Sequence, residues 1–110
     1  MVFRAKNKTV RVRGLRPEVL FGLLVVKSVL SEHGYDTVIT SGVDSKHGYG
    51  SLHYSGGAVD IRSKHIPTIV EKHQILREFQ ENLPADFDIV LEYLGTSNEH
   101  YHMEYQPKGV

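Results

Sequence analysis

The sequence contains no cysteine. Disulfide-stabilised scaffolds, cysteine nucleophiles and metal sites built on thiolates are therefore excluded. It also lacks a long apolar run, because the longest one, Val19 to Val26, is interrupted by Gly22 and falls far below the roughly 20 residues of a membrane span. The first residues lack the apolar stretch and the cleavage site of a secretory signal. We expect a protein made in the cytoplasm, with no membrane segment.

The net charge is zero, with 13 Lys and Arg residues against 13 Asp and Glu residues. This balance argues against a dedicated nucleic-acid-binding protein, which needs clustered positive charge. Six of the cations nevertheless precede the first acid, Glu18. Residues 1–15 are therefore either a basic arm that contacts an anionic polymer or an edge strand whose cations discourage pairing with other sheets. The edge strand is the favoured interpretation.

The chain of 110 residues fits a single domain spanning 1–110. A helix is predicted from Pro17, which suits the first turn of a helix, to His33, where Gly34 follows as a typical residue after a helix end. The apolar face predicted for this helix consists of Val19, Leu20, Leu23, Leu24, Val26 and Leu30.

A second helix is predicted over Ile66–Leu83, with Pro67 in its first turn and Pro84 after its end. Its apolar stripe would consist of Ile66, Ile69, Leu76, Phe79 and Leu83. Short β-branched or alternating segments predict strands at 37–40, 58–62, 88–94 and 100–105. The expected fold is α+β, with two helices packed on a small, mainly antiparallel sheet.

Residues 41–57 form a seventeen-residue segment with five glycines and few aliphatic side chains. A loop of this length in a small domain is more often functional than not. Seven histidines occur in the chain. Of these, His33 is expected to cap a helix C-terminus, and His73 is expected at the edge of the core on the second helix.

The informative histidines are His53, at the end of the glycine-rich loop, and His100 with His102, which project from one face of a predicted strand. Asp60 lies on the strand that follows the loop. Two imidazoles and one carboxylate are the usual protein ligands of a catalytic zinc ion. Spacing alone also allows a salt-bridged Asp60 with histidines on the surface.

Residues 51–60, SLHYSGGAVD, match the pattern S-x-H-x-x-G-x-A-x-D, and residues 99–102, EHYH, match an acid–His–x–His motif. Together they resemble the zinc D-alanyl-D-alanine peptidase family. That family includes D,D-carboxypeptidases, vancomycin-resistance dipeptidases and phage L-alanyl-D-glutamate endopeptidases, and it shares its fold with the hedgehog signalling domain. The resemblance spans roughly residues 16–106, so a hedgehog/DD-peptidase-like fold is expected.

The resemblance implies that His53, Asp60 and His102 bind one zinc ion per chain. It implies that Glu99 acts as the general base and that His100 assists the tetrahedral intermediate. Glu99 and His102 are three residues apart, so Glu99 would lie in the turn before the strand. The family pattern further implies that Ser51 makes a hydrogen bond near the ligands or to the substrate carboxylate.

Two departures from the family pattern concern substrate binding. Asp44 stands where many members have an arginine, and the chain has no tryptophan, which many members have near the catalytic acid. Lys46 or His47 would then be the candidates to replace the arginine.

The function implied is a zinc metallopeptidase that cuts a peptide bond in peptidoglycan stem peptides, as a D,D-carboxypeptidase or an L-alanyl-D-glutamate endopeptidase. We expect a monomer that meets the cell wall after release at phage lysis or as a virion component. The alternative is a non-catalytic zinc module that binds cell wall or a partner protein. A non-haem iron oxygenase, whose metal site also uses two histidines and a carboxylate, is disfavoured because its usual scaffold is an eight-stranded jelly roll.

Overall fold

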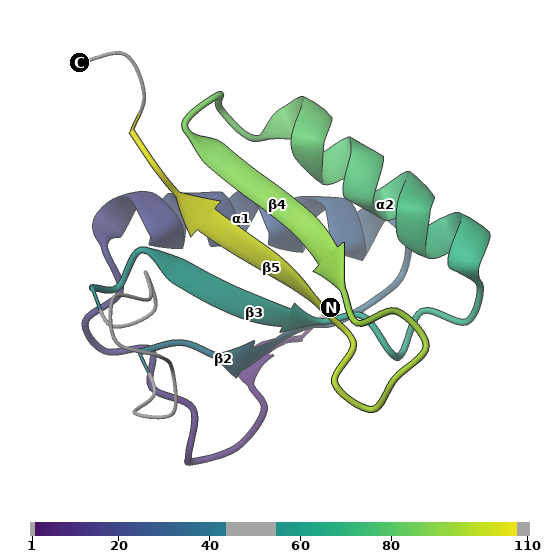
Figure 1. Cartoon of the computed structure of the whole chain (residues 1–110), viewed down its shortest axis with the longest axis horizontal. Coiled ribbons are helices and arrows are strands. Elements are labelled where there is room, and N and C mark those ends of the chain that lie inside the picture. The colour runs from purple at the N-terminus through teal and green to yellow at the C-terminus, as the bar shows by residue number, and fades with distance from the viewer. Residues whose placement is uncertain (1, 44–54, 108–110) are drawn as a thin grey trace.

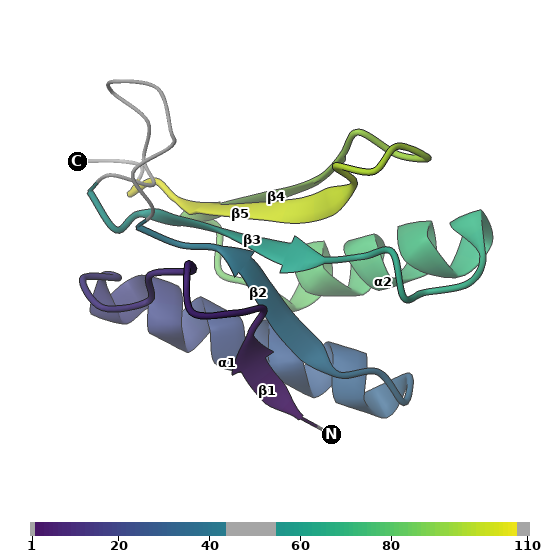
Figure 2. The same ribbon diagram turned by 90° about the horizontal axis from the view of Figure 1, so that it is seen from below.

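A computed structural model of the chain describes residues 2–43 and 55–107. The elements in chain order are β1 (Phe3–Ala5), α1 (Pro17–Glu32), β2 (Thr37–Ser41), β3 (Ala58–Arg62), α2 (Ile69–Asn82), β4 (Phe87–Glu92) and β5 (His100–Tyr105). The described strands form one sheet in the order β1-β2-β3-β5-β4, in which only β1 and β2 pair in parallel. Both helices cover the same face of this sheet (Figures 1 and 2). The predicted α+β class is confirmed.

Helix α1 begins at Pro17 and ends before Gly34, as predicted. Gly34 has a φ of 85°, a left-handed conformation that glycine adopts without strain. The prediction of the apolar face is wrong for two residues, because Leu20 and Leu24 are 49% and 61% exposed. The face that meets the sheet is narrower, because only one side of the helix contacts it. Its buried residues are Val19, Gly22, Leu23, Val26, Val29 and Leu30.

Helix α2 begins at Ile69, three residues later than predicted, because Thr68 caps it. The Thr68 hydroxyl accepts a hydrogen bond from the Glu71 backbone N–H at 3.1 Å. The buried side of the helix also differs from the predicted stripe, since Ile75 is fully buried while Ile69 is exposed. The prediction that His73 lies at the core edge is wrong, since this residue is exposed.

The basic N-terminal segment contributes the short strand β1, which lies at an edge of the sheet. Strand β1 pairs with β2 in the register Arg4 to Val38. The chain then contacts both ends of the glycine-rich segment. The Val43 N–H donates to the Arg11 carbonyl at 2.7 Å, and the Arg16 N–H donates to the Gly56 carbonyl at 3.0 Å.

Strand β4 runs from Phe87 to Glu92 and so ends two residues earlier than predicted. The turn begins at Tyr93, whose φ of 55° takes it out of the extended conformation. Alternate residues of the central strands, including Val59, Ile61, Tyr101 and Met103, are fully buried in the core. The residues between them must therefore face away from the helices. Neither described helix has the length and apolar character needed to cross a membrane.

Candidate metal site

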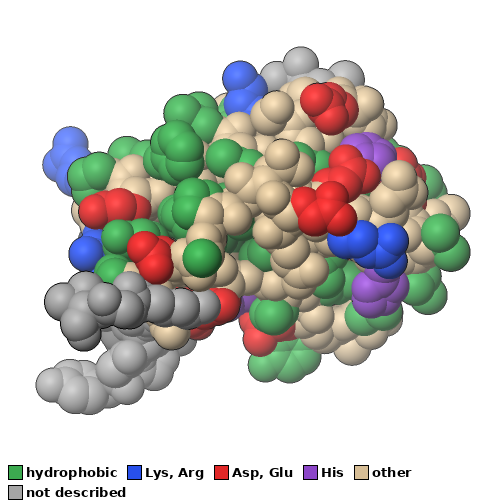
Figure 3. All heavy atoms as spheres, turned by 90° about the horizontal axis from the view of Figure 1, so that it is seen from above, with side chains coloured by type: hydrophobic (Ala, Val, Ile, Leu, Met, Phe, Trp, Pro, Cys, Tyr) green, Lys and Arg blue, Asp and Glu red, His purple; other side chains and the backbone are tan. Residues whose placement is uncertain are grey.

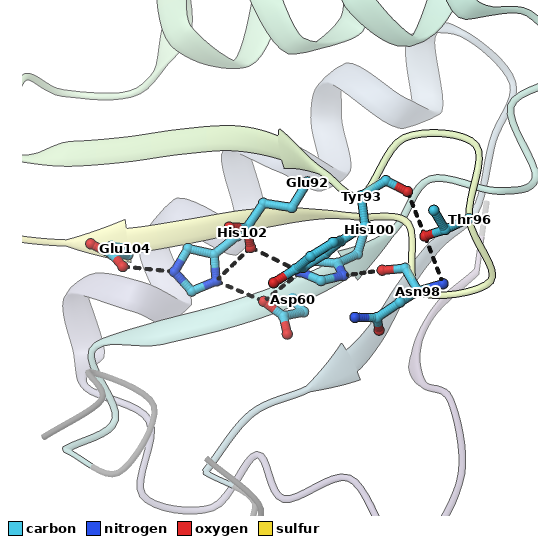
Figure 4. A network of polar contacts seen from close by, with 8 residues as sticks. All are labelled: Asp60, Glu92, Tyr93, Thr96, Asn98, His100, His102 and Glu104. Carbon is cyan, nitrogen blue, oxygen red and sulfur yellow. Dashed lines mark hydrogen bonds and ion pairs between the residues drawn. The ribbon is translucent and has the colours of Figure 1, made fainter. Parts of the chain in front are cut away.

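The candidate site lies on the sheet face opposite the helices, where β3, β5 and β4 run side by side. Strand register places Asp60 opposite His102, and places His100 between Arg62 on β3 and Glu92 on β4. All of these side chains occupy alternate positions that point away from the core. Figure 4 shows Asp60, His100 and His102 converging, with Glu92 and Glu104 beside them.

Asp60, His100 and His102 each offer one ligand atom, and these atoms lie within 4.8 Å of one another. Asp60 and His100 are 9% and 8% exposed, so the group is largely removed from water. Ligands at ordinary zinc distances stand roughly 3.4 Å apart. Only small side-chain movements would therefore be needed, and the group could hold a metal ion.

The ring of His100 is oriented by the backbone. Its Nδ1 lies 2.6 Å from the Asn98 carbonyl oxygen and must donate to it, since a carbonyl only accepts. The other ring nitrogen, Nε2, therefore faces the carboxylates, at 3.6 Å from Asp60 Oδ1 and 3.1 Å from Glu92 Oε1. A metal ion bound at Nε2 would lie between the ring and these two carboxylates.

His102 lies between two carboxylates. Its Nδ1 is 2.8 Å from Asp60 Oδ1 and its Nε2 is 2.7 Å from Glu104 Oε1. Burial acts to lower the pKa of His102, but the hydrogen bonds to Asp60 and Glu104 outweigh it and raise the pKa to about 9. A metal ion at Nδ1 would displace that proton, while Glu104 would keep the Nε2 proton and hold the ring.

Two acids of the site were not predicted. Glu104 is two residues after His102, so strand periodicity alone could have placed it on the same face. Glu92 could not be found from spacing, because its place beside His100 depends on the pairing register of β4 with β5. Its Oε1 also lies 3.9 Å from His102 Nδ1.

Glu99 lies directly before β5, in the turn where it was predicted. Its carboxylate, however, accepts hydrogen bonds from Ser63 Oγ at 2.5 Å and the Gly95 N–H at 3.0 Å, and pairs with Lys72 Nζ at 2.8 Å. Burial acts to raise the pKa of Glu99, but the Gly95, Lys72 and Ser63 donors lower it to about 2. The carboxylate is thus directed toward α2, and its role as a general base stays a prediction.

The structure brings part of the predicted ligand set together. Asp60 and His102 are in contact, and His100, predicted as an assisting residue, joins them. The other predicted site residues lie outside the described residues, and their roles stay predictions: the zinc ligand His53, and Lys46, His47 and Ser51.

The candidate metal group opens into a pocket of about 380 Å³. A pocket of this size falls within the range of small-molecule and peptide sites. Its lining residues are Ser41, Asp60, Glu92, Tyr93, Asn98, His100 and His102. A ligand in the pocket would therefore contact the metal group directly.

Comparisons with models of protein families, with curated protein sequences and with solved structures found no significant match to this chain.

Proposed function

We propose that the chain is a zinc metallopeptidase that hydrolyses a peptide bond in bacterial peptidoglycan stem peptides. The observation that carries the proposal is the group formed by Asp60, His100 and His102 at the wall of an open pocket. The order and spacing of the two sequence motifs support the substrate class. The proposal includes a hedgehog/DD-peptidase-like fold, action on the cell wall after phage lysis or from a virion, and a monomeric state.

The donor set suits zinc, because two imidazole nitrogens and one carboxylate oxygen leave a fourth tetrahedral position open. A bound zinc ion lowers the pKa of a coordinated water to about 7 and polarises a substrate carbonyl. The Asn98 carbonyl and the Glu104 carboxylate fix the two imidazoles through their outer nitrogens. His53 remains a further candidate ligand.

Proton transfer needs a carboxylate within reach of the open position. Glu92 fits this role best, because its Oε1 lies between the two histidines and its side chain is 39% exposed. It can accept a proton from water in the pocket and then donate it to the leaving amine. Glu99, the base implied by the resemblance, would first have to leave Lys72 and Ser63.

The binding of the Glu99 carboxylate by Lys72 and Ser63 also favours a second candidate function. If Glu99 is the family base and stays bound to Lys72, the chain would be a zinc-containing module that binds cell wall or a partner protein without cleaving it. Stoichiometric zinc together with binding to intact wall, but without new peptide fragments, would identify this function.

Cleavage of purified peptidoglycan tests the proposal. The zinc-loaded protein is incubated with sacculi of several wall chemotypes, and the released fragments are identified by mass spectrometry. We expect stem-peptide fragments from the wild-type protein and from Glu81→Gln, an exposed control on α2. Fragments should be lost in His102→Ala and Glu92→Gln. Unchanged sacculi of every chemotype would overturn the proposal.

Comparison of Glu92→Gln with Glu99→Gln separates the two candidate bases. Loss of cleavage in Glu92→Gln alone, with folded protein in both cases, supports the geometric assignment. Loss in Glu99→Gln alone, with an unchanged far-ultraviolet circular dichroism spectrum, supports the base implied by the sequence motif.

A further inference from the structure

A second pocket adjoins the metal group on the side of β3 and the 97–99 turn. It has a volume of about 140 Å³ and shares Ser41, Asp60, Asn98 and His100 with the larger pocket. The rest of its wall differs sharply in charge, because it includes Lys6, Arg62 and Lys64. The two pockets therefore share four lining residues but differ in the charge of the others.

The three cations of this pocket make no ion pair with any carboxylate of the described residues. Lys64 Nζ donates to the Ser97 carbonyl at 2.7 Å, which holds it near the turn without neutralising it. The acids of the wall are already engaged, since Glu99 pairs with Lys72 at 2.8 Å and Asp60 contacts His102 at 2.8 Å. The pocket therefore keeps an excess of positive charge.

The excess charge lies close to the metal group. Arg62 is opposite His100 in the β3–β5 register and two residues from Asp60 on the same face of β3. Two residues along a strand correspond to roughly 6.6 Å. Arg62, Asp60 and His100 also line the same pocket, so one small ligand in it can contact both the cation and the metal group.

We propose that Lys6, Arg62 and Lys64 form an anion-binding subsite that holds a carboxylate of the peptide substrate. Arginine binds a carboxylate through two parallel hydrogen bonds, and the lysines add charge at the rim. A volume of about 140 Å³ admits a carboxylate with a few carbon atoms. That the ligand is a peptide substrate rests on the proposed function. The carboxylate can be that of a chain terminus or of an acidic side chain.

Small carboxylates test the subsite without the metal. Metal-free protein is titrated at low ionic strength with N-acetyl-alanine, N-acetyl-glutamate α-amide or neutral N-acetyl-alanine amide, and backbone signals are followed by NMR. We expect the two carboxylates to shift the signals of Arg62, Lys64 and Asn98 with saturation, and the neutral amide to leave them unchanged. The carboxylate that binds more tightly identifies the source of the anion.

Arg62→Gln should weaken carboxylate binding by about fivefold or more, because it removes the bidentate donor. Arg77→Gln, which removes an exposed arginine of α2, is the matched control and should bind as the wild type. Equal binding of the neutral amide, absence of saturable binding, or full binding in Arg62→Gln would each overturn the subsite.

The experiments can overturn the proposed subsite and the proposed peptidase function independently. Carboxylate binding without cleavage of any peptidoglycan overturns the proposed peptidase and supports the anion site. Cleavage that continues in Arg62→Gln with an unchanged KM overturns the subsite and leaves the peptidase standing. A raised KM of Arg62→Gln with a kcat similar to that of the wild type supports both the subsite and the peptidase.

Discussion

Glu99 is only 4% exposed, yet its carboxylate is ionised and surrounded by three donors. Its pKa of about 2 lies below the ordinary value of 4.5. A group whose pKa is lower in the folded state stabilises the protein above its ordinary pKa. The stabilisation from Glu99 is therefore present above pH 4.5 and is lost as the pH falls toward 2.

We predict that Glu99→Gln lowers the free energy of unfolding at pH 7 by about 2–3 kcal/mol, because Lys72 loses its partner in a largely buried place. Urea denaturation measures the loss. The difference from wild type should shrink as the pH falls toward 2, where wild-type Glu99 becomes protonated. Glu81→Gln should behave as the wild type, and equal stabilities at pH 7 for Glu99→Gln and wild type would contradict the prediction.

The residues of the site differ in how far the sequence could reveal them. Asp60 and His102 belong to local motifs, and strand periodicity places His100 beside His102. The direction of Glu99 could not be predicted, because it depends on Lys72 of α2, which lies 27 residues away in the chain. Pairing between distant elements is information that a single motif does not contain.

At the scale of elements, the N-terminal segment fixes the two ends of the glycine-rich segment through close backbone contacts. A Cβ added at Gly56 would lie 2.1 Å from the Gly14 carbonyl oxygen, and one added at Gly42 would lie 2.0 Å from the Arg11 carbonyl oxygen. Backbone atoms cannot move aside as a flexible side chain can. The glycines are therefore required here for close approach.

Gly56→Ala is expected to destabilise the protein by about 3 kcal/mol or more, because crowding adds to the strain of a φ of 77°. Gly34→Ala is the matched control, since Gly34 also has a positive φ but would have no atom within 4 Å of an added Cβ. It should cost only about 1–2 kcal/mol. Thermal and urea unfolding compare the variants, and equal losses would show that crowding at Gly56 is relieved.

His33 links the two helices. Its Nδ1 lies 3.2 Å from Glu71 and its Nε2 lies 2.9 Å from Glu78, while the Tyr35 hydroxyl donates to Glu71 at 2.5 Å. Burial acts to lower the pKa of His33, but the hydrogen bonds to Glu78 and Glu71 outweigh it, so that the pKa is raised. The protonated ring therefore holds the end of α1 against α2.

This contact predicts a pH dependence of stability. A raised pKa stabilises the folded state fully below the ordinary value of 6.5, and the contribution is lost as the pH rises through the folded-state pKa. His33→Gln should therefore destabilise the protein more at pH 6 than at pH 9. Urea unfolding at both values measures the difference. His73→Gln, which changes an exposed histidine, should show no such dependence.

The elements themselves were largely predictable because proline, glycine and hydrophobic periodicity act locally. Pro17 and Gly34 mark the ends of α1, and the alternation of residues 58–62 marks β3. The errors concern faces and ends, such as exposed Ile69 and the early end of β4 at Glu92. The side of α2 that is buried depends on packing against distant elements, and the end of β4 depends on the backbone of Tyr93. Local hydrophobicity encodes neither.

At the scale of the whole molecule, the net charge is zero, although six cations precede the first acid, Glu18. On the face shown in Figure 3, side chains of both signs lie among hydrophobic ones. This face therefore offers no broad area of positive charge to a polyanion. Local groups of charge, such as those at the two adjoining pockets, must therefore provide any selectivity.

Metal binding should stabilise the whole fold, because the ligands come from different strands and meet only in the folded state. Zinc at about 100 times its dissociation constant adds about 2.7 kcal/mol, which corresponds to roughly 10 °C or more in melting temperature for a domain of this size. Differential scanning fluorimetry measures the shift. Asp60→Asn should reduce it strongly and Glu81→Gln should not. An identical shift in Asp60→Asn would place the zinc elsewhere.

The strand order has a last consequence. β5 comes after the other described strands in the chain, but it lies between β3 and β4 at the centre of the site. During synthesis the sheet must therefore leave a gap, or open one, until this strand arrives. Asp60 exists early in translation, but it meets its two histidine neighbours only after residue 102 has left the ribosome. A nascent or truncated chain that stops before β5 therefore lacks the complete group of Asp60, His100 and His102.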